Sequence, residues 1–258
     1  MTRQLLFYDN VTPISKQRHA DWSIDSGRGR FEFARNVNSV PLMATEIPRA
    51  ASDYTVVFAG RDDAIMPVVI LGIDGDTNLY VEEDGGWKAR YIPAFVRRYP
   101  FVFSRSEDGK TFTLCLDESW DGCNQDGRGE RLFDDEGERT EYLQNVLNFV
   151  NEYQNQFRLT EAYCNRLKEL DLLEPMQAQF TLAGGEKRSL TGFMAVNRKK
   201  LKQLPADDLS GLAQSDELEL IYNHMHSMNH FAEMLKLAVE QKEGVKDEKT
   251  EEKEEKGD

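Results

Sequence analysis

Long apolar runs are missing from this sequence. The longest weakly polar stretch, residues 65–73, is interrupted by Pro67 and Gly72, whereas a bilayer-spanning helix needs roughly 20 apolar residues. The first nine residues also contain no apolar run of the length that a signal peptide has. We therefore expect a soluble, cytoplasmic protein without a membrane span.

Cysteine is also scarce, and acidic residues outnumber basic ones. Cys115, Cys123 and Cys164 are an odd number of thiols without Cys-x-x-Cys spacing, which favours reduced thiols over a disulfide framework. The formal net charge is −14 at pH 7. An acidic surface disfavours nucleic acid, because phosphates attract Lys and Arg. The Lys/Glu-rich residues 241–258 are expected to form a charged, disordered tail.

Motifs of the common enzyme classes are absent from the sequence as well. No Gly-rich fingerprint follows an expected strand, and there is no Gly-x-Ser-x-Gly elbow. Cys115 and Cys164 fall in an expected strand and helix, where a thiol is more often a buried hydrophobe than a nucleophile. No cofactor is predicted. The sequence favours a non-catalytic protein and leaves an enzyme open.

The pattern His224-x-His226-x-x-x-His230 is the best candidate for a metal site. On one expected helix, His226 and His230 lie four residues apart and Glu233 follows on the same side. His224 would lie roughly 200° round the helix from His226 and miss that site. Three ligands from consecutive turns of one straight helix rarely close around an ion. We therefore predict no metal, with His226, His230 and Glu233 as weak candidates.

The spacing of apolar residues changes near the middle of the chain. Residues 30–131 contain short β-branched runs bounded by turns, at 54–59, 66–73, 101–103 and 111–116. Residues 138–240 follow the helical repeat, interrupted by an expected β-hairpin over 177–196. The prediction is an α+β fold in which a β-rich antiparallel N-terminal part packs with C-terminal helices and the inserted hairpin. Residues 1–240 are expected to form a single domain.

Three finer predictions concern the ends of these elements. Strands over 78–81 and 87–91 are expected to meet at a tight turn around Gly85 and Gly86. Thr160 is expected to cap a second helix after one that ends near Phe157, and Ser215 to cap one long helix that reaches Val239.

One segment, Tyr91-Ile-Pro-Ala-Phe-Val-Arg-Arg-Tyr-Pro-Phe-Val-Phe103, stands out against this acidic background. Arg97 and Arg98 lie between aromatic side chains, and Pro93 and Pro100 stiffen the backbone on either side. A paired arginine in so apolar a segment is unusual for a soluble surface, and it requires an explanation.

Two interpretations of this arginine pair compete. In the structural one, a guanidinium bonds buried carbonyls or a carboxylate such as Glu46 or Asp117, while aromatic faces stack on it. In the functional one, the pair presents a fork to an anionic ligand. We prefer the structural interpretation because an apolar setting demands internal pairing. The candidate ligand-binding residues are Arg97, Arg98, Glu46 and Trp87.

The segment 92–101 is one of several with a distinctive pattern. The others are Val40-Pro-Leu-Met-Ala-Thr-Glu-Ile-Pro-Arg-Ala50, Asn78-Leu-Tyr-Val81 with Gly86-Trp87, Cys115-Leu-Asp-Glu118, Leu132-Phe-Asp-Asp-Glu-Gly137, Leu172-Leu-Glu-Pro175 and Gly185-Glu-Lys-Arg-Ser-Leu-Thr-Gly192, followed by the final helix. Together they resemble the SapC family of bacterial proteins over most of the chain before the tail.

The resemblance implies a cellular role but no particular reaction. The family takes its name from association with bacterial surface-layer (S-layer) genes, and its genes tend to lie near those of TonB-dependent receptors. It supplies no catalytic or binding residue. We therefore expect a soluble accessory or interaction protein with a protein partner, linked to cell-surface (S-layer) or outer-membrane uptake systems. The alternative is an enzyme or small-anion-binding protein that uses a pocket near Arg97 and Arg98.

Overall fold

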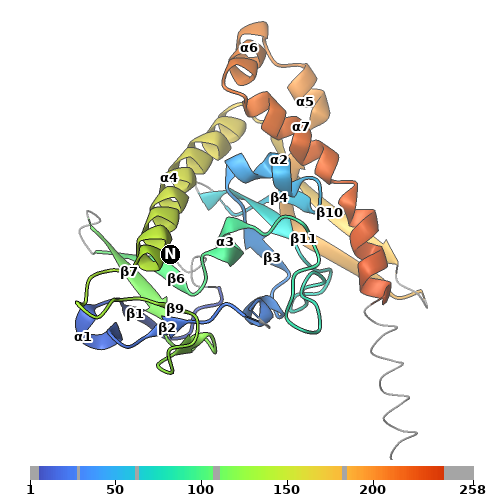
Figure 1. The fold of residues 1–258 in the computed structure, drawn as a ribbon. Coiled ribbons are helices and arrows are strands. Elements are labelled where there is room, and N and C mark those ends of the chain that lie inside the picture. The colour runs from blue at the N-terminus through green and yellow to red at the C-terminus, as the bar shows by residue number, and fades with distance from the viewer. Residues whose placement is uncertain (1–5, 28–29, 62–63, 107–110, 182–184, 241–258) are drawn as a thin grey trace, which may run out of the picture. The chain divides into compact units, whose positions relative to one another are not determined.

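The structure is a computed structural model that describes residues 6–27, 30–61, 64–106, 111–181 and 185–240 (Figure 1). The expected tail, residues 241–258, lies outside the described residues. Contacts divide the chain into two compact units. Unit 1 consists of Met1–Ala34, Val81–Trp87 and Ala94–Arg158, and unit 2 of Arg35–Tyr80, Lys88–Pro93 and Leu159–Asp258. A compact unit is not by itself an independently folding domain, so the single domain over residues 1–240 stays a prediction.

Unit 1 contains two small antiparallel sheets among its described residues. In the first, β7 (Phe112–Asp117) lies between β1 (Val11–Pro13) and β6 (Phe101–Arg105). In the second, β2 (Ser23–Ile24) lies between β8 (Cys123–Asn124) and β9 (Glu130–Arg131). The strands expected over 101–103 and 111–116 are confirmed as β6 and β7. The short helical segments of this unit are α1 (Lys16–His19), η2 (Glu32–Ala34) and α3 (Ala94–Arg97).

Helix α4 (Glu141–Glu169) is shared between the units, with residues up to Arg158 in unit 1 and those from Leu159 in unit 2. It contains neither Gly nor Pro over its 29 residues, so no residue interrupts its hydrogen-bond ladder. The predicted cap at Thr160 is wrong. The Thr160 hydroxyl lies inside the continuous helix and accepts a hydrogen bond from the Ala44 amide at 2.8 Å.

The core of unit 1 combines the first sheet with α4. Leu114 and Leu116 alternate along β7, and they belong to one buried cluster with Phe101 of β6 and with Leu143 and Val150 of α4. This period-two alternation on a strand, facing a helical stripe, is the expected way for a sheet to bury one face.

Unit 2 is built on a five-stranded antiparallel sheet in the order β10-β11-β4-β5-β3. Its strands are β3 (Ser39–Pro41), β4 (Thr55–Ala59), β5 (Met66–Ile70), β10 (Leu173–Thr181) and β11 (Lys187–Val196). The strands expected over 54–59 and 66–73 and the hairpin expected over 177–196 are confirmed. Pairing of Phe193 with Ala59 joins that C-terminal hairpin to the N-terminal strands.

Helices cover the centre of this sheet. The β4 side chains Val56, Val57 and Phe58 are fully buried, and α7 (Glu217–Ser227) contacts β4, β11, α2 (Ile47–Ala50) and α6 (Ala206–Gln214). The remaining short elements are η3 (Ala44–Glu46) and α5 (Arg198–Lys202). The prediction of N-terminal strands packed with C-terminal helices is therefore confirmed, and the fold is α+β.

The final helix differs from its prediction at its start and by a break in its middle. Ser215 ends α6, where its hydroxyl donates to the Gly211 carbonyl at 3.0 Å, so α7 begins at Glu217. The helix then breaks after Ser227 and resumes over residues 230–240. The Ser227 hydroxyl donates to the His224 carbonyl at 2.6 Å, and such a bond competes with the helix ladder.

The strands expected over 78–81 and 87–91 reduce to one bridge between Val81 and Trp87. The Glu82 amide donates to the Gly86 carbonyl at 2.9 Å, and Gly85 has a φ of 77°. The turn itself is therefore as predicted, but the ladder does not extend beyond it among the described residues.

Candidate functional site

Arg98 is the buried member of the arginine pair. It follows α3 and is 3% exposed. Its guanidinium carbon lies 4.4 Å from the ring centroid of Phe95, 4.6 Å from that of Tyr153 and 5.8 Å from that of Tyr8. A guanidinium at these distances is attracted by the faces of the rings. The structure thus places Arg98 in an aromatic cage inside unit 1.

Asp117, at the end of β7, is a fully buried carboxylate in the same unit. It accepts hydrogen bonds from the backbone amides of Asp9 at 2.8 Å, Asn10 at 3.1 Å and Ser119 at 3.1 Å. The hydroxyls of Ser119 and Tyr99 donate to it at 2.6 and 3.3 Å. Burial alone would raise the pKa of Asp117, but the bonds from Ser119, Asp9 and Asn10 outweigh it and lower that pKa.

The other three predicted ligand-binding residues lie in different settings. Arg97 is exposed, and its guanidinium carbon lies 5.2 Å from the ring centroid of Phe149 on α4. Trp87 is half-buried and meets the ring of Phe31 edge to face at 5.5 Å. Both belong to unit 1 with Arg98, whereas Glu46 belongs to unit 2.

Glu46 is engaged within unit 2. Its carboxylate accepts hydrogen bonds from the Tyr91 hydroxyl at 2.5 Å and the Met43 amide at 2.9 Å, and the residue is 7% exposed. The combination of Glu46 with Arg97, Arg98 and Trp87 in one ligand site stays a prediction.

A second polar cluster of unit 1 joins Glu118 to Arg18 and His19. The carboxylate accepts hydrogen bonds from Arg18 at 2.5 and 2.6 Å, and its Oε1 atom lies 3.1 Å from Nε2 of His19. The Ser15 amide donates to Nδ1 of His19 at 3.3 Å, so the imidazole proton lies on Nε2. The hydrogen bond from Arg18 lowers the pKa of Glu118, and burial lowers the pKa of His19.

The candidate metal ligands are separated by the break in the final helix. His226 is exposed on α7, while Nε2 of His230 lies 3.0 Å from the Ala51 carbonyl oxygen. Glu233 accepts hydrogen bonds from the Lys236 ammonium at 2.9 and 3.1 Å. Within the described ranges, no group of three His, Cys, Asp or Glu side chains is placed to hold a metal ion.

Sequence reasoning missed the role of His224. Its side chain is fully buried in unit 2, where Nδ1 lies 2.8 Å from the Val56 carbonyl oxygen and Nε2 lies 3.1 Å from the Val196 amide. Burial lowers the pKa of His224 to about 4. The available signal was its place in the apolar stripe, three residues after Ile221, which indicates an inward position.

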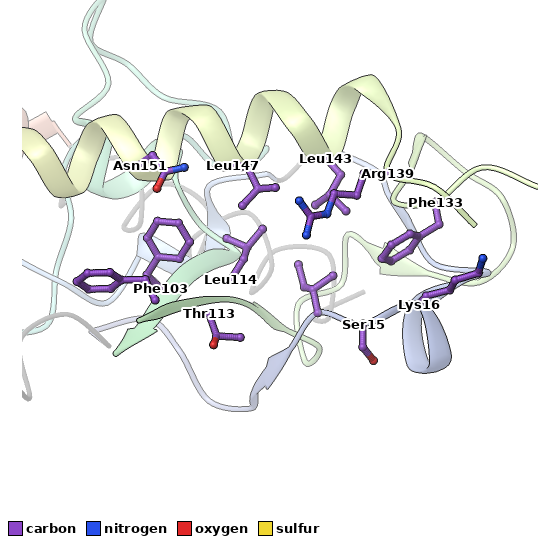
Figure 2. A pocket seen from close by; sticks show the side chains of 12 residues that line it. Ser15, Lys16, Phe103, Thr113, Leu114, Phe133, Arg139, Leu143, Leu147 and Asn151 are labelled. Atoms are coloured by element: carbon purple, nitrogen blue, oxygen red, sulfur yellow. The ribbon is translucent and has the colours of Figure 1, made fainter. Parts of the chain in front are cut away.

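Sequence reasoning also missed a groove of about 520 Å³ in unit 1 (Figure 2). Figure 2 shows Leu143 and Leu147 of α4 facing Phe103 and Leu114 of the sheet across it. Its apolar lining residues are Ile14, Phe103, Phe112, Leu114, Phe133, Leu143 and Leu147. The lining comes from distant parts of the sequence, so the one local signal was the spacing of Leu143 and Leu147, which lie four residues apart on one helical face.

Two cations belong to the lining of this groove. Figure 2 shows Arg139 beside Leu143 and Lys16 on the far side of Phe133, while Asn151 lies at the opposite end beside Phe103. Lys16, Arg139 and Asn151 are exposed. The groove is therefore a trough with an apolar floor, a polar rim and one cationic end.

Comparison with protein families gives one match. The SapC family model matches residues 14–234. The chain belongs to the SapC family. The match confirms the resemblance drawn from the segment 92–101 and the others. No curated protein and no solved structure matches the chain.

The SapC match spans residues of both compact units and every residue that lines the groove. It also includes Arg97, Arg98, Glu46 and Trp87. None of the helices in the described ranges is long and apolar enough to cross a membrane.

Proposed function

We propose that this SapC-family chain is an accessory binding protein that acts in the cytoplasm through a protein partner. The groove of unit 1 carries the proposal, because its lining combines apolar side chains with two cations and no acid. Such surfaces suit docking, since buried apolar contacts give affinity and a few charges give orientation. The family name supports a link to the cell surface, and the association with receptor genes supports a link to nutrient uptake.

The ionisable groups with lowered pKa values favour binding over catalysis. Asp117, Glu118, His19 and His224 all use their polar atoms to hold backbone or side-chain groups of this chain. A general acid or base needs to reach a proton on the substrate. The four side chains that could act as general acids or bases are thus already hydrogen-bonded to other groups of their own unit.

The alternative of an enzyme or small-anion-binding protein near Arg97 and Arg98 has less support. A fork for an anion requires an accessible guanidinium, yet Arg98 is 3% exposed and lies among three aromatic rings. Arg97 is exposed, so a substitution at this residue can test the alternative. An Arg97→Ala variant that melts like the wild type but loses a co-purifying small anion would favour it.

Native mass spectrometry of tagged full-length chain, purified gently from its own host, tests the proposal. We expect a complex with one protein at fixed stoichiometry. The control is the same purification after a wash at high salt, because an interaction guided by two cations weakens there. A chain that carries a small molecule and no protein would contradict the proposal and favour the alternative.

A further inference from the structure

The cationic end of the groove is held in place by a tight turn. Phe133 and Arg139 pair across this turn in a single antiparallel bridge. Inside it, the Gly137 amide donates to the Asp134 carbonyl at 3.0 Å, and the Glu138 amide to the Asp134 carboxylate at 2.8 Å. The backbone position of Arg139 is therefore fixed before any ligand arrives.

Lys16 is fixed on the same turn from the other side. Its Nζ atom donates to the Glu136 carbonyl at 2.7 Å, which leaves further donors of the ammonium group for a second partner. Arg139 forms no ion pair with any residue in the described part of the chain. Lys16 and Arg139 are thus the two charged residues that line the groove on either side of Phe133.

The charge of the lining contrasts with the charge of the chain. Among the 12 described residues that line the groove, none is Asp or Glu, and two are cationic. The whole chain carries −14. The turn beside the groove also carries Asp134, Asp135, Glu136 and Glu138 outside the lining. A negatively charged group of a partner is therefore best placed within the groove beside Arg139 and Lys16, away from these acids.

The shape of the groove favours a segment of a macromolecule over a small ligand. Small-ligand sites bury about 70–90% of their ligand, whereas Lys16, Thr113, Arg139 and Asn151 leave this rim exposed. From Leu143 to Asn151 the α4 wall runs roughly 12 Å at 1.5 Å per residue. Three or four extended residues span about that distance.

We propose that the groove binds a short segment of a partner protein that carries a carboxylate beside two or three apolar side chains. The carboxylate lies beside Arg139 and Lys16, and the apolar side chains lie against Phe103, Phe112 and Leu147, which are half-buried residues of the lining. This inference rests on the proposed accessory function and names the chemistry of its partner. The carboxylate belongs to an Asp or Glu side chain or to a chain terminus.

A peptide selection on the full-length chain tests this chemistry. Two displayed libraries of random octapeptides are used, one with free C-termini and one anchored at both ends. We expect enrichment of an acidic residue next to apolar residues in the anchored library, or of apolar C-terminal residues in the free one. The two libraries thereby distinguish a side-chain carboxylate from a terminal one. Enrichment without an acidic or terminal preference would overturn the proposal.

Fluorescence anisotropy with the best selected peptide then locates the site. Arg139→Gln should weaken binding about tenfold or more, because a charge-assisted hydrogen bond is lost. Arg158→Gln is the matched control, since it removes an exposed arginine outside the lining. Changing the carboxylate of the peptide to an amide should cost a similar factor on the wild type and almost none on Arg139→Gln. Equal affinities for the two arginine variants would overturn the assignment.

Two further outcomes separate this inference from the proposed function. If dodecanoate displaces an anionic naphthalene dye from the wild type but not from Arg139→Gln, and no peptide is selected, the groove takes an aliphatic carboxylate and the peptide proposal is overturned. If native mass spectrometry finds a partner protein that binds Arg139→Gln and wild type equally, the accessory function stands and the groove is excluded as its docking site.

Discussion

The Nε2 atom of His224 accepts a hydrogen bond from the backbone amide of Val196 at 3.1 Å. The Nδ1 atom donates to the Val56 carbonyl at 2.8 Å, so the imidazole is neutral with its proton on Nδ1. The pairing of β11 with β4 ends at Met194 and Phe58, and the same register continued would place Val196 opposite Val56. The imidazole therefore replaces a ladder hydrogen bond between two strands.

This placement makes the stability of unit 2 sensitive to mild acid. Burial lowers the pKa of His224 from 6.5 to about 4. Between these values the unfolded chain binds the proton and the folded chain does not, so stability falls as pH is lowered through this window. At 1.36 kcal/mol per pKa unit, the free energy of unfolding falls by roughly 3 kcal/mol towards pH 4. Urea unfolding at pH 7 and pH 4.5 measures the change.

Two variants isolate the contribution of His224 from that of His19, whose pKa is lowered in the same direction. His224→Gln keeps a donor and an acceptor but does not titrate, so its stability should depend less on pH over this range, at about 1–3 kcal/mol lower stability at pH 7. His226→Gln changes an exposed residue and should behave like the wild type. The idea fails if wild type and His224→Gln lose the same stability between the two pH values.

Asp117→Asn should lower the free energy of unfolding by about 2–3 kcal/mol at pH 7. The amide would turn a donor towards backbone amides that now donate to a carboxylate, and hydrogen bonds to charged groups are the stronger ones. Because the fold lowers the pKa of Asp117, its stabilisation is present above the unfolded pKa of about 3.9 and is lost as pH falls through the folded value. Chemical unfolding at pH 7 and pH 3 measures both effects.

Asp9→Asn is the control for this change. The Asp9 backbone amide donates to Asp117, whereas its own side chain is exposed. This variant removes one negative charge and leaves the hydrogen bond in place, so its stability should stay within about 0.5 kcal/mol of the wild type. An equal loss in the two variants would mean that net charge, and not the Asp117 hydrogen bonds, sets the effect.

The sequence predicts where strands and helices lie better than it predicts which of them pack or pair together. The β-branched runs of β4 and β5 indicate strands by themselves, and both strands are present. No local pattern indicates that β11 pairs with β4, since this pairing joins distant parts of the chain. The same limit applies to Thr160, which has the chemistry of a helix cap but bonds the remote Ala44 amide.

Arg98→Lys should destabilise unit 1 more than Arg97→Ala. Arg98 lies within 6 Å of three ring centroids, and a flat guanidinium stacks on such rings in a way that an ammonium does not. We expect a loss of about 1–3 kcal/mol for Arg98→Lys and less than about 1 kcal/mol for the exposed Arg97→Ala. Thermal unfolding at pH 7 compares them. An Arg98→Lys variant that melts like the wild type would favour the functional interpretation of the pair.

The candidate metal ligands and the groove also depend on contacts between distant parts of the chain. The spacing of His226, His230 and Glu233 indicates a shared helical face, but a break after Ser227 separates His226 from the other two. The sequence does not show this break. The Ser227 hydroxyl at the break bonds the His224 carbonyl and also accepts from the remote Val56 amide, a contact that no local pattern indicates. The groove is hidden for a similar reason, since its walls meet only in the folded chain.

Gly137→Ala should release Lys16 from the turn at the cationic end of the groove. Gly137 has a φ of 77°, and a Cβ atom there would lie 1.8 Å from Cε of Lys16. Gly127 has a φ of 75° with no atom within 4 Å of such a Cβ, so Gly127→Ala is the matched control. Both variants should lose about 1–2 kcal/mol, because left-handed backbone disfavours a side chain.

Only Gly137→Ala should also change the rate at which the Lys16 side chain reacts with acylating reagents. Its Nζ atom donates to the Glu136 carbonyl at 2.7 Å, and a displaced side chain loses this bond and is more accessible to acylating reagents. Labelling with acetic anhydride, read by mass spectrometry of the Lys16 peptide, should be several-fold faster in Gly137→Ala than in Gly127→Ala. Equal labelling rates would show that the turn accommodates a methyl group without moving Lys16. In that case the fixed position of this cation would not depend on Gly137, and Arg139 alone would define the cationic end.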